Sequence, residues 1–362
     1  MCHSWSAVSF QLNRMGVSNM KISVIGLDLA KDVFQVHGVD ERGQVTLRRQ
    51  LKRNQVLAFF ANLDPCLVGL EACGGFHYWA RAIGKHGHTA RAMAPQFVKP
   101  YVKSQKNDAN DAEAICEAVQ RPGMRFVPVK TVNQQSILQL HHARRLLTKM
   151  RVGLSNHMRA MLLEYGIALP QGVKTLPSRL PAILEDADNG LTETTRALLA
   201  SLHEQWQSLR AQADRLEAQI HAWHRQNEAS RRLSEIPGVG VLTATALVGT
   251  IGDAKVFQNG RQLAAYLGLV PQQRSSGGRE KLLGITKRGD GYVRTLLIHG
   301  ARAVIRWARL RARAGAAADP WLTALLARMH ANKAAVAQAN KTARIAWALL
   351  ARNRTYAPGA SA

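Results

Sequence analysis

Short apolar runs separated by polar turns predict that the chain begins with β-strands. Residues 22–25 and 33–36 are rich in Val, Ile and Phe, as is typical of strands, and residues 44–47 continue the pattern. Residues 40–43, with the sequence DERG, are typical of a hairpin turn between the last two runs. We therefore expect three antiparallel strands at the start of the first domain.

The pattern then alternates between helix and strand. Residues 55–63 and 76–86 have helical periodicity, whereas residues 66–71 and 89–93 are short runs typical of strands. A further helix is expected to begin near Asp108, where Asn and Asp residues suit the capping position. This order of elements indicates an α/β domain.

Two long helical segments follow, over residues 133–165 and 192–227. Three prolines between them are expected to interrupt the helical pattern: Pro170, Pro177 and Pro181. The second segment has apolar residues at alternating steps of four and three, which form a heptad seam: Leu202, Trp206, Leu209, Ala213, Leu216, Ile220 and Trp223. Such a seam predicts either a helical hairpin within one chain or a contact between two copies.

The last third of the chain is rich in Gly, Ala and Arg. Residues 234–247 predict a helix-hairpin-helix, a motif whose Gly turn and helix N-terminus can face a DNA phosphate. Residues 266–281 predict a Gly/Ser loop dense in cations, residues 287–291 a second basic turn, and residues 292–313 a helix. The candidate nucleic-acid contacts are Gly238, Gly240, Arg274, Arg279, Lys281, Lys287 and Arg288.

These patterns divide the chain into four regions. We expect a flexible tail over residues 1–19, an α/β domain over 20–130, a helical coiled-coil region over 131–230 and a basic, mainly α-helical domain over 231–355. The tail is either a loose extension or an over-long start, because Met20 immediately precedes the first strand.

Charge points to a nucleic-acid partner. The net charge is +25, and residues 231–362 alone carry 21 Lys and Arg against 5 Asp and Glu, a net charge of +16. Such a polycation favours nucleic acid over a small metabolite, although a solvated basic surface is the simpler alternative. The four cysteines have no CxxC spacing and indicate reduced thiols in a cytosolic protein. With no apolar run of roughly 18 residues, we expect a protein without a membrane partner.

Four acidic residues form a pattern that none of them forms alone. Asp28 and Glu71 each end a predicted strand, and Asp108 and Asp111 share one face at the start of a helix. Taken singly, Asp28 is a turn cap, and the helical pair satisfies the helix dipole. Together, four carboxylates can hold two Mg²⁺ ions that clamp the oxygens of a phosphodiester displacement. On a sheet that opens with three antiparallel strands, this set suits an RNase H-like nuclease domain.

Six segments give the chain a family resemblance: GLDLAK, GLEACGG, KNDANDAEAI, IPGVG, LGLVPQQRSSGG and ITKRGDGYVRTLLIHGA. Together they resemble the DEDD transposases of the IS110 family, particularly its IS1111 branch, from Met20 to about Trp307. The resemblance implies a RuvC-like domain joined through a coiled coil to a C-terminal transposase domain with a nucleophilic serine. It also implies guidance by a non-coding bridge RNA.

The resemblance assigns roles to individual residues. It makes Asp28, Glu71, Asp108 and Asp111 ligands of Mg²⁺, in a two-metal site that Mn²⁺ could also fill, and it makes Ser276 the nucleophile. Because Ser275 is adjacent, the nucleophile could instead be Ser275. Without the resemblance, the segment suits a flexible loop. A serine hydroxyl needs activation by a base or metal, and the cations of this loop can stabilise charge on the phosphate.

The expected protein is a transposase-recombinase of the bacterial cytosol that acts on donor and target DNA as a homodimer or homotetramer. One alternative is a metal-dependent nuclease, similar to Holliday-junction resolvases, that uses water in place of serine. Another is a non-catalytic protein that packages nucleic acid, which the charge favours but which has no need of the four acids.

Overall fold

The computed structural model describes four stretches of the chain: residues 21–103, 107–172, 175–315 and 319–357. The predicted tail over residues 1–19 lies outside the described residues. The chain divides into two compact units, one ending at Val129 and the other beginning at Lys130. Within the described stretches, every helix is too short, too polar or too charged to span a bilayer.

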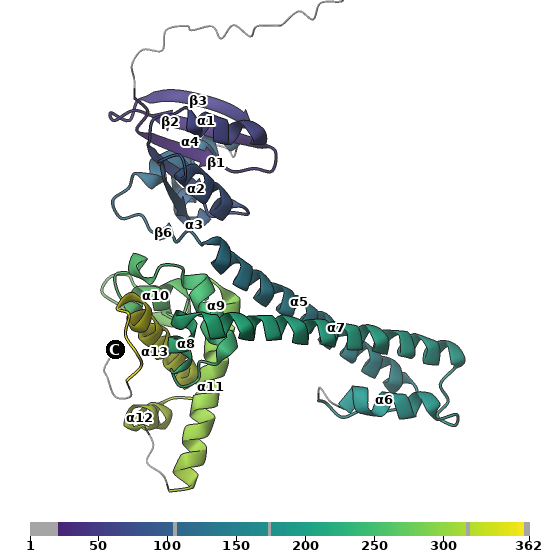
Figure 1. Cartoon of the computed structure of the whole chain (residues 1–362). Coiled ribbons are helices and arrows are strands. Elements are labelled where there is room, and N and C mark those ends of the chain that lie inside the picture. Colours follow the sequence, from purple (N-terminus) through teal and green to yellow (C-terminus); the bar gives the residue numbers. More distant parts are fainter. Residues whose placement is uncertain (1–20, 104–106, 173–174, 316–318, 358–362) are drawn as a thin grey trace, which may run out of the picture. The chain divides into compact units, whose positions relative to one another are not determined.

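The first unit is built on a six-stranded sheet in the order β3-β2-β1-β4-β5-β6 (Figure 1). The strands are β1 Val24–Asp28, β2 Val33–Val39, β3 Val45–Lys52, β4 Leu67–Glu71, β5 Thr89–Met93 and β6 Phe126–Val127. The first three strands are antiparallel, as predicted, and β4 and β5 run parallel to β1. Strand β6 was not predicted, because two residues are too few to show alternation.

Helices cover both faces of this sheet. They are α1 Val56–Ala61, α2 Phe76–Gly84, α3 Pro95–Val98 and α4 Asp108–Val119, with 3-10 turns η1 Arg53–Gln55 and η2 Lys99–Tyr101. On one face Ile25 and Leu27 pack with Phe60 of α1 and Trp79 of α2. On the other face Val24 packs in a second core with α4. Alternation along β1 therefore turns Gly26 and Asp28 toward α4, the same side as Val24.

Two glycines let α4 lie directly against the sheet. A Cβ atom at Gly26 would lie 2.1 Å from the Ala112 carbonyl oxygen, and a Cβ at Gly69 would lie 2.9 Å from the Val119 Cβ. Real Cβ atoms do not approach backbone this closely, so a side chain at Gly26 would push α4 away. The glycines of β1 and β4 thus set the height of α4 over the strand ends.

A Gly26→Ala substitution should lower the free energy of unfolding by about 1–3 kcal/mol, because α4 must shift to admit the methyl group. Gly84 at the end of α2 is the matched control, since a Cβ there meets nothing within 4 Å. Gly84→Ala should be neutral or slightly stabilising. Urea unfolding measures both, and a Gly26→Ala protein as stable as wild type would contradict this close packing.

The second unit is mainly helical. Its helices are α5 Val132–Glu164, α6 Thr175–Glu185, α7 Glu193–Gln226, α8 Glu228–Ser234, α9 Val241–Ile251, α10 Gly260–Tyr266, α11 Gly291–Arg313, α12 Pro320–Arg328 and α13 Ala331–Ala351, with a 3-10 turn η3 Ala254–Val256. Two strands, β7 Pro271–Gln273 and β8 Leu282–Ile285, form a separate hairpin. This composition matches the predicted α/β region followed by a mainly helical region.

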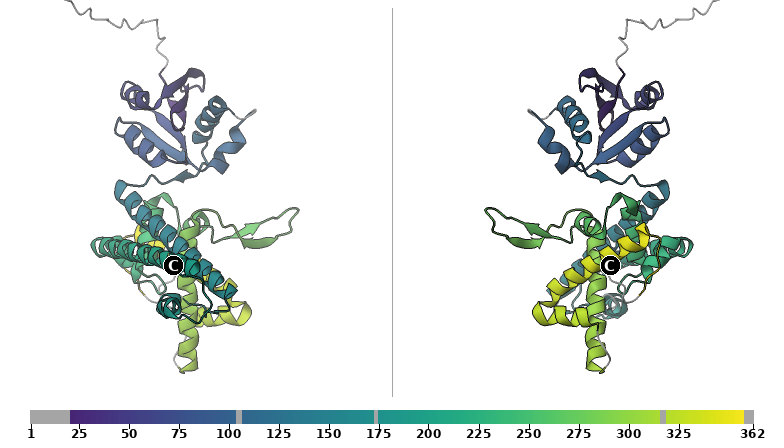
Figure 2. Two further views of the ribbon diagram at one scale, coloured as in Figure 1. Left: turned by 90° about the vertical axis from the view of Figure 1, so that its right-hand side faces the viewer. Right: turned by 90° about the vertical axis from the view of Figure 1, so that its left-hand side faces the viewer.

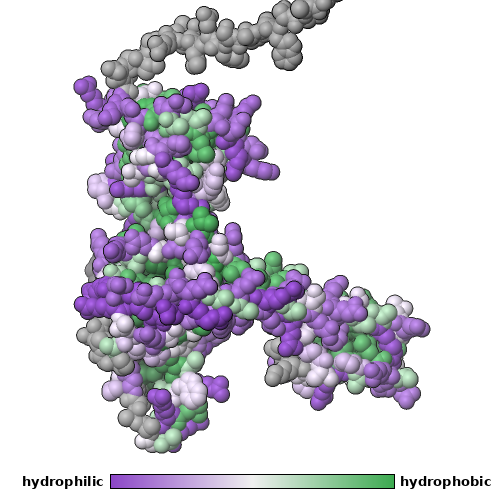
Figure 3. Space-filling view, viewed as in Figure 1, coloured by the Kyte–Doolittle hydropathy of each residue, from purple (hydrophilic) through white to green (hydrophobic). Residues whose placement is uncertain are grey.

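Helices α5 and α7 form an antiparallel hairpin within the chain (Figure 1). Trp206 of the α7 seam is buried, and its indole Nε1 donates a hydrogen bond of 2.7 Å to Ser155 Oγ of α5. An Arg144–Glu217 ion pair of 2.6 Å also joins the helices. Of the two arrangements that the heptad seam allowed, the chain uses the intramolecular one. In Figure 3 hydrophilic residues dominate the visible surface of this hairpin, with apolar residues exposed toward α6.

The expected interruption at Pro177 and Pro181 is wrong, because both lie within α6. Pro177 is in the first turn, where a missing N–H removes no intrahelical hydrogen bond. Pro181 does remove one, and the burial of Leu176 and Leu180 against α5 and α7 offsets that loss. Packing, which local sequence does not show, therefore decides this segment.

The predicted helix-hairpin-helix corresponds to α8, a tight turn and α9. Gly238 has a positive φ of 85°, and a Cβ there would lie 2.7 Å from the Gly300 carbonyl oxygen of α11. Helix α9 is almost completely buried in the main core of the unit. The turn is thus held against α11 by a close approach of two backbones.

Candidate functional site

The strand ends bring Asp28 and Glu71 side by side. Strands β1 and β4 pair in parallel, with Leu27 opposite Leu70, so the next residue of each strand is an acid. Both acids lie at the carboxyl end of their strands and share the face that α4 covers. Parallel pairing therefore turns two acids that are 43 positions apart in the sequence into neighbours.

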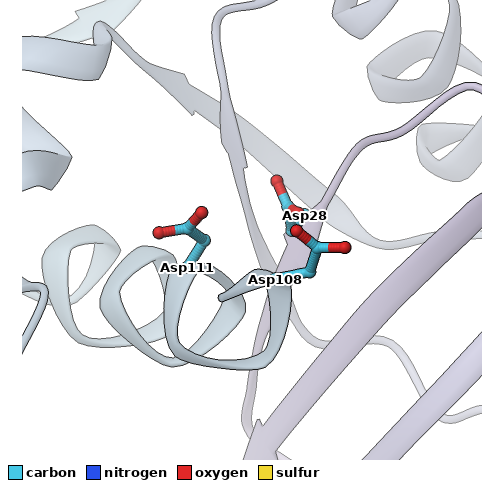
Figure 4. A group of neighbouring side chains, drawn as sticks. All are labelled: Asp28, Asp108 and Asp111. Atoms are coloured by element: carbon cyan, nitrogen blue, oxygen red, sulfur yellow. The ribbon is translucent and has the colours of Figure 1, made fainter. Parts of the chain in front are cut away.

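The start of α4 supplies the other two acids. Asn107 caps the helix, its side-chain oxygen accepting a hydrogen bond of 2.8 Å from the Asn110 N–H. Asp108 and Asp111 lie in the first turn, as predicted. Carboxylate oxygens of Asp28, Asp108 and Asp111 lie within 4.8 Å of one another, and Figure 4 shows the three side chains gathered beside the end of β1.

Like charges at this site disfavour ionisation. Burial, followed by the negative charges of Asp111, Asp108 and Glu71, raises the pKa of Asp28 from 3.8 to about 6. Glu71 lies outside the 4.8 Å group, but its charge acts on Asp28. Oxygen donors with excess negative charge suit a hard divalent cation, so this acidic group can hold one.

The raised pKa predicts how stability depends on pH. Ionising Asp28 is less favourable in the folded chain, so without metal the stability falls as pH rises from about 4 through about 6. At roughly 1.4 kcal/mol per pKa unit the penalty is at most about 3 kcal/mol, and solvent reduces it because the side chain is partly exposed.

In EDTA at pH 7.5, Asp28→Asn should therefore raise the Tm, whereas the exposed control Asp64→Asn should not. Near pH 4 the Asp28→Asn advantage should vanish. Added Mg²⁺ should raise the Tm of wild type more than that of Asp28→Asn. Differential scanning fluorimetry measures each value, and equal Tm values for wild type and Asp28→Asn at pH 7.5 would refute the electrostatic argument.

Ser276 lies in the second unit, at the tip of the hairpin formed by β7 and β8. Gly277 and Gly278 have φ values of 58° and 74°, which define a two-residue turn with both central residues left-handed. The Arg279 N–H donates a hydrogen bond of 3.1 Å to the Ser276 carbonyl oxygen and closes the turn. The predicted Gly/Ser loop is therefore the loop of a short hairpin, and its adjacent glycines form the tight turn. Figure 2 shows this hairpin projecting from the helices of its unit.

The two neighbouring serines differ in their hydrogen bonds. Ser275 Oγ accepts from Gln273 Nε2 at 2.9 Å and from the Lys281 N–H at 3.4 Å. Ser276 is exposed, and within the described part of the chain its hydroxyl has no hydrogen-bond partner. Ser275 therefore stabilises the hairpin, whereas Ser276 presents its hydroxyl to the surroundings.

The base of the hairpin is held by backbone contacts. A Cβ at Gly268 would lie 2.2 Å from the Arg288 carbonyl oxygen, and one at Gly289 would lie 2.0 Å from the Tyr266 carbonyl oxygen. The Arg294 guanidinium donates to the Leu267 and Arg288 carbonyl oxygens at 3.1 and 2.9 Å. The glycines of both predicted basic segments therefore fix where the hairpin leaves the helical core.

The predicted nucleic-acid contacts fall into two groups. The cationic ones are exposed on the hairpin or at its base: Arg274, Arg279, Lys281, Lys287 and Arg288. Gly238 and Gly240 lie in the turn between α8 and α9, where Gly238 is half-buried against α11 and Gly240 is exposed at the α9 N-terminus. Gly238 thus has a packing role, and its contact with nucleic acid stays a prediction.

Cys73, which had no predicted role at the site, lies beside the strand-end acids. Burial and the charges of Glu71 and Asp28 raise the pKa of its thiol, which favours the protonated form. Its position two residues after Glu71 was the available signal, but the sequence alone does not show that the chain turns back there.

Comparisons with known proteins agree on one group. A profile described as a transposase, of the DEDD type found in IS110, matches residues 25–167, and one for the transposase IS116/IS110/IS902 family matches residues 230–316. A probable family 20 transposase of Pseudomonas aeruginosa is 51% identical, covering 94% of this chain and 100% of its own. The transposase for insertion sequence element IS1111A of Coxiella burnetii is 44% identical, and the match covers 97% of this chain and 95% of that protein. A pilin gene-inverting protein of Moraxella bovis is 24% identical, and the match covers 71% of this chain and 75% of that protein.

Proposed function

Because the chain belongs to the IS110/IS116 family of transposases, enzymes that cleave DNA and transfer strands, we propose that its acidic group and Ser276 carry out this reaction. The observation that carries the proposal is the gathering of Asp28, Asp108 and Asp111 within 4.8 Å. The strand order β3-β2-β1-β4-β5, with three antiparallel strands followed by two parallel ones, supports an RNase H-like, RuvC-like identity for the first unit.

The acidic group fits Mg²⁺ by its donor chemistry. Asp28, Asp108 and Asp111 would be the ligands, with Glu71 as a fourth acid at the end of the next strand. Four carboxylates are enough for two ions, and Mn²⁺ accepts the same oxygen donors. Bound divalent ions would lower the pKa of a coordinated hydroxyl group and neutralise charge on the reacting phosphate.

Ser276 is the proposed nucleophile. Its reaction keeps the energy of the cleaved phosphodiester bond in a new ester bond to the serine. The Oγ atom gives up its proton and bonds to phosphorus, while the bond from phosphorus to one strand oxygen breaks and that oxygen takes up a proton. The resulting phosphoserine ester is then attacked by a hydroxyl group of another strand, which restores the serine. Arg274, Arg279 and Lys281, exposed on the same hairpin, would stabilise negative charge on the phosphate.

Two further observations support this choice of nucleophile. The hydroxyl of Ser276 is not used to hold the hairpin together, whereas that of Ser275 is. A relative in Moraxella bovis is a pilin gene-inverting protein. Inverting a segment requires every cut strand to be rejoined, and a covalent protein–DNA intermediate allows rejoining without another energy source.

The proposed partners are donor DNA, target DNA and a guide RNA. The +16 charge of residues 231–362 supports binding to phosphates, while the guide RNA rests on the family resemblance. Sequencing the RNA that copurifies with the protein tests whether it binds a guide RNA.

A homodimer or homotetramer would bring two DNA molecules together. Leu146 and Met150 of α5, 58% and 49% exposed, offer apolar contacts for such an assembly. Light scattering gives the assembly size.

A strand-exchange assay tests the function as a whole. Labelled donor and target duplexes incubated with the protein, Mg²⁺ and the copurified RNA should give recombinant strands and a protein-linked intermediate. Cleavage without a protein-linked product would favour the resolvase-like nuclease. Binding without any cleavage would favour a packaging protein.

A further inference from the structure

A large basic groove in the second unit is lined by residues of α10, α12 and α13. Helix α13 packs against both α10 and α12 (Figure 1). The volume of the groove is about 1040 Å³. Among the described residues that line it, five side chains are cationic and one, Asp319, is acidic. The cations are Arg261, Lys341, Arg344, Arg352 and Arg354. This excess of positive charge suits a ligand with several phosphates.

Aromatic rings alternate with these cations. Trp347 is held in place because its indole N–H donates to the carbonyl oxygens of Ala254 and Phe257, at 3.2 and 3.0 Å. The Arg352 guanidinium lies 5.4 Å from the centre of that ring. Trp321 is 37% exposed, and the Lys341 ammonium lies 4.1 Å from its ring centre. The groove therefore pairs an aromatic ring with a cation at two positions, and hydrogen bonds hold the Trp347 ring in place.

The combination distinguishes between ligand classes. An acidic peptide would need the cations but not the aromatic rings, and an apolar ligand would need the rings but not the cations. A DNA duplex offers phosphates, but its bases are stacked inside and cannot reach a tryptophan. A single strand offers both phosphates and unstacked bases, and base stacking on aromatic side chains contributes about 1–3 kcal/mol per base.

We propose that this groove binds a single-stranded nucleic-acid segment. Bases of the strand stack on Trp321 and Trp347, and its phosphates contact Arg352, Arg354 and Arg261. Most of the groove lies beyond residues 230–316, the stretch that the C-terminal family profile matches. The inference rests on the proposed nucleic-acid partners of residues 231–362 and adds a binding site for a single strand, but it depends neither on the acidic group nor on Ser276.

The test measures binding of the full-length protein to fluorescent oligonucleotides of about 15 nucleotides, a length in the range that single-strand-binding modules contact. Single-stranded DNA, single-stranded RNA and duplex DNA are compared by anisotropy in EDTA, where no strand cleavage occurs. Trp321→Leu and Arg354→Ala should each weaken single-strand binding about tenfold, in line with the loss of one stacked base or one phosphate contact. Trp321→Phe should retain most of it.

Trp307→Leu is the matched control. Trp307 is 65% exposed on α11 and does not line the groove, so its loss should leave single-strand affinity unchanged. Equal melting temperatures of the variants exclude unfolding as the cause of any weakening. The assay needs no strand cleavage, so a failure of this proposal is separate from a failure of the serine chemistry.

Photocrosslinking identifies the contact directly. Oligonucleotides that carry 4-thiouridine or 5-iododeoxyuridine should crosslink to peptides containing Trp321 or Trp347, and the pair of probes shows whether RNA, DNA or both occupy the groove. Crosslinks confined to other segments would overturn the proposal. Single-strand affinities unchanged by both Trp321→Leu and Arg354→Ala would overturn it as well.

Discussion

Asp28→Asn is expected to lower DNA strand exchange by about a thousandfold or more, with the fold intact. The substitution removes one ligand charge from the acidic group and leaves a side chain of nearly the same size. The carboxylates of Asp108, Asp111 and Glu71 remain, but three acids hold divalent ions less tightly than four. Since metal-free Asp28 destabilises the fold above about pH 6, loss of activity should accompany a gain in stability.

A substitution that lowers activity while it raises stability distinguishes a residue of the site from a structural one. Substitution of a residue that matters only for folding would lower both activity and stability. Asp108→Asn, Asp111→Asn and Glu71→Gln should likewise abolish exchange, while exposed Asp64→Asn should retain it. Gel assays of recombinant strands in Mg²⁺, with DNA affinity measured separately, give the result. Exchange at the wild-type rate in any one of the four variants would remove that residue from the site.

The acidic group could be predicted because its signals are local. Asp28 and Glu71 follow short apolar runs, and strands of a parallel pair end at the same edge of a sheet. Asp108 and Asp111 follow a helix cap. The height of α4 over the sheet could not be predicted, because it depends on Gly26 and Gly69 meeting backbone atoms about 50 to 90 positions away.

Other features were not predictable for related reasons. Pro181 lies inside α6 because Leu180 is buried by α5 and α7, a contact that local propensity does not include. The basic groove includes Trp321 and Trp347, which lie on two different helices and show no shared spacing in the sequence. The turn of the hairpin formed by β7 and β8 could have been predicted, since Gly277-Gly278 is a strong turn signal. The strands themselves could not, because β7 and β8 are too short to show alternation.

Ser276→Ala is expected to abolish the covalent protein–DNA intermediate and strand exchange while leaving DNA affinity within about twofold of wild type. The residue is exposed at the hairpin tip, so removing its hydroxyl costs little stability. Ser275→Ala is the matched neighbour. It loses two hydrogen bonds inside the hairpin, so it should lower the exchange rate without abolishing it. The two rates are compared under identical conditions of DNA, RNA and Mg²⁺.

The covalent bond between protein and DNA can be located by mass spectrometry. Wild-type protein is incubated with labelled DNA and Mg²⁺, denatured, and digested, and the DNA-linked peptide is sequenced by mass spectrometry. We expect a phosphodiester remnant on Ser276, present in Ser275→Ala and absent from Ser276→Ala and Asp28→Asn. A remnant on Ser275, or cleaved DNA without any protein attached, would contradict it.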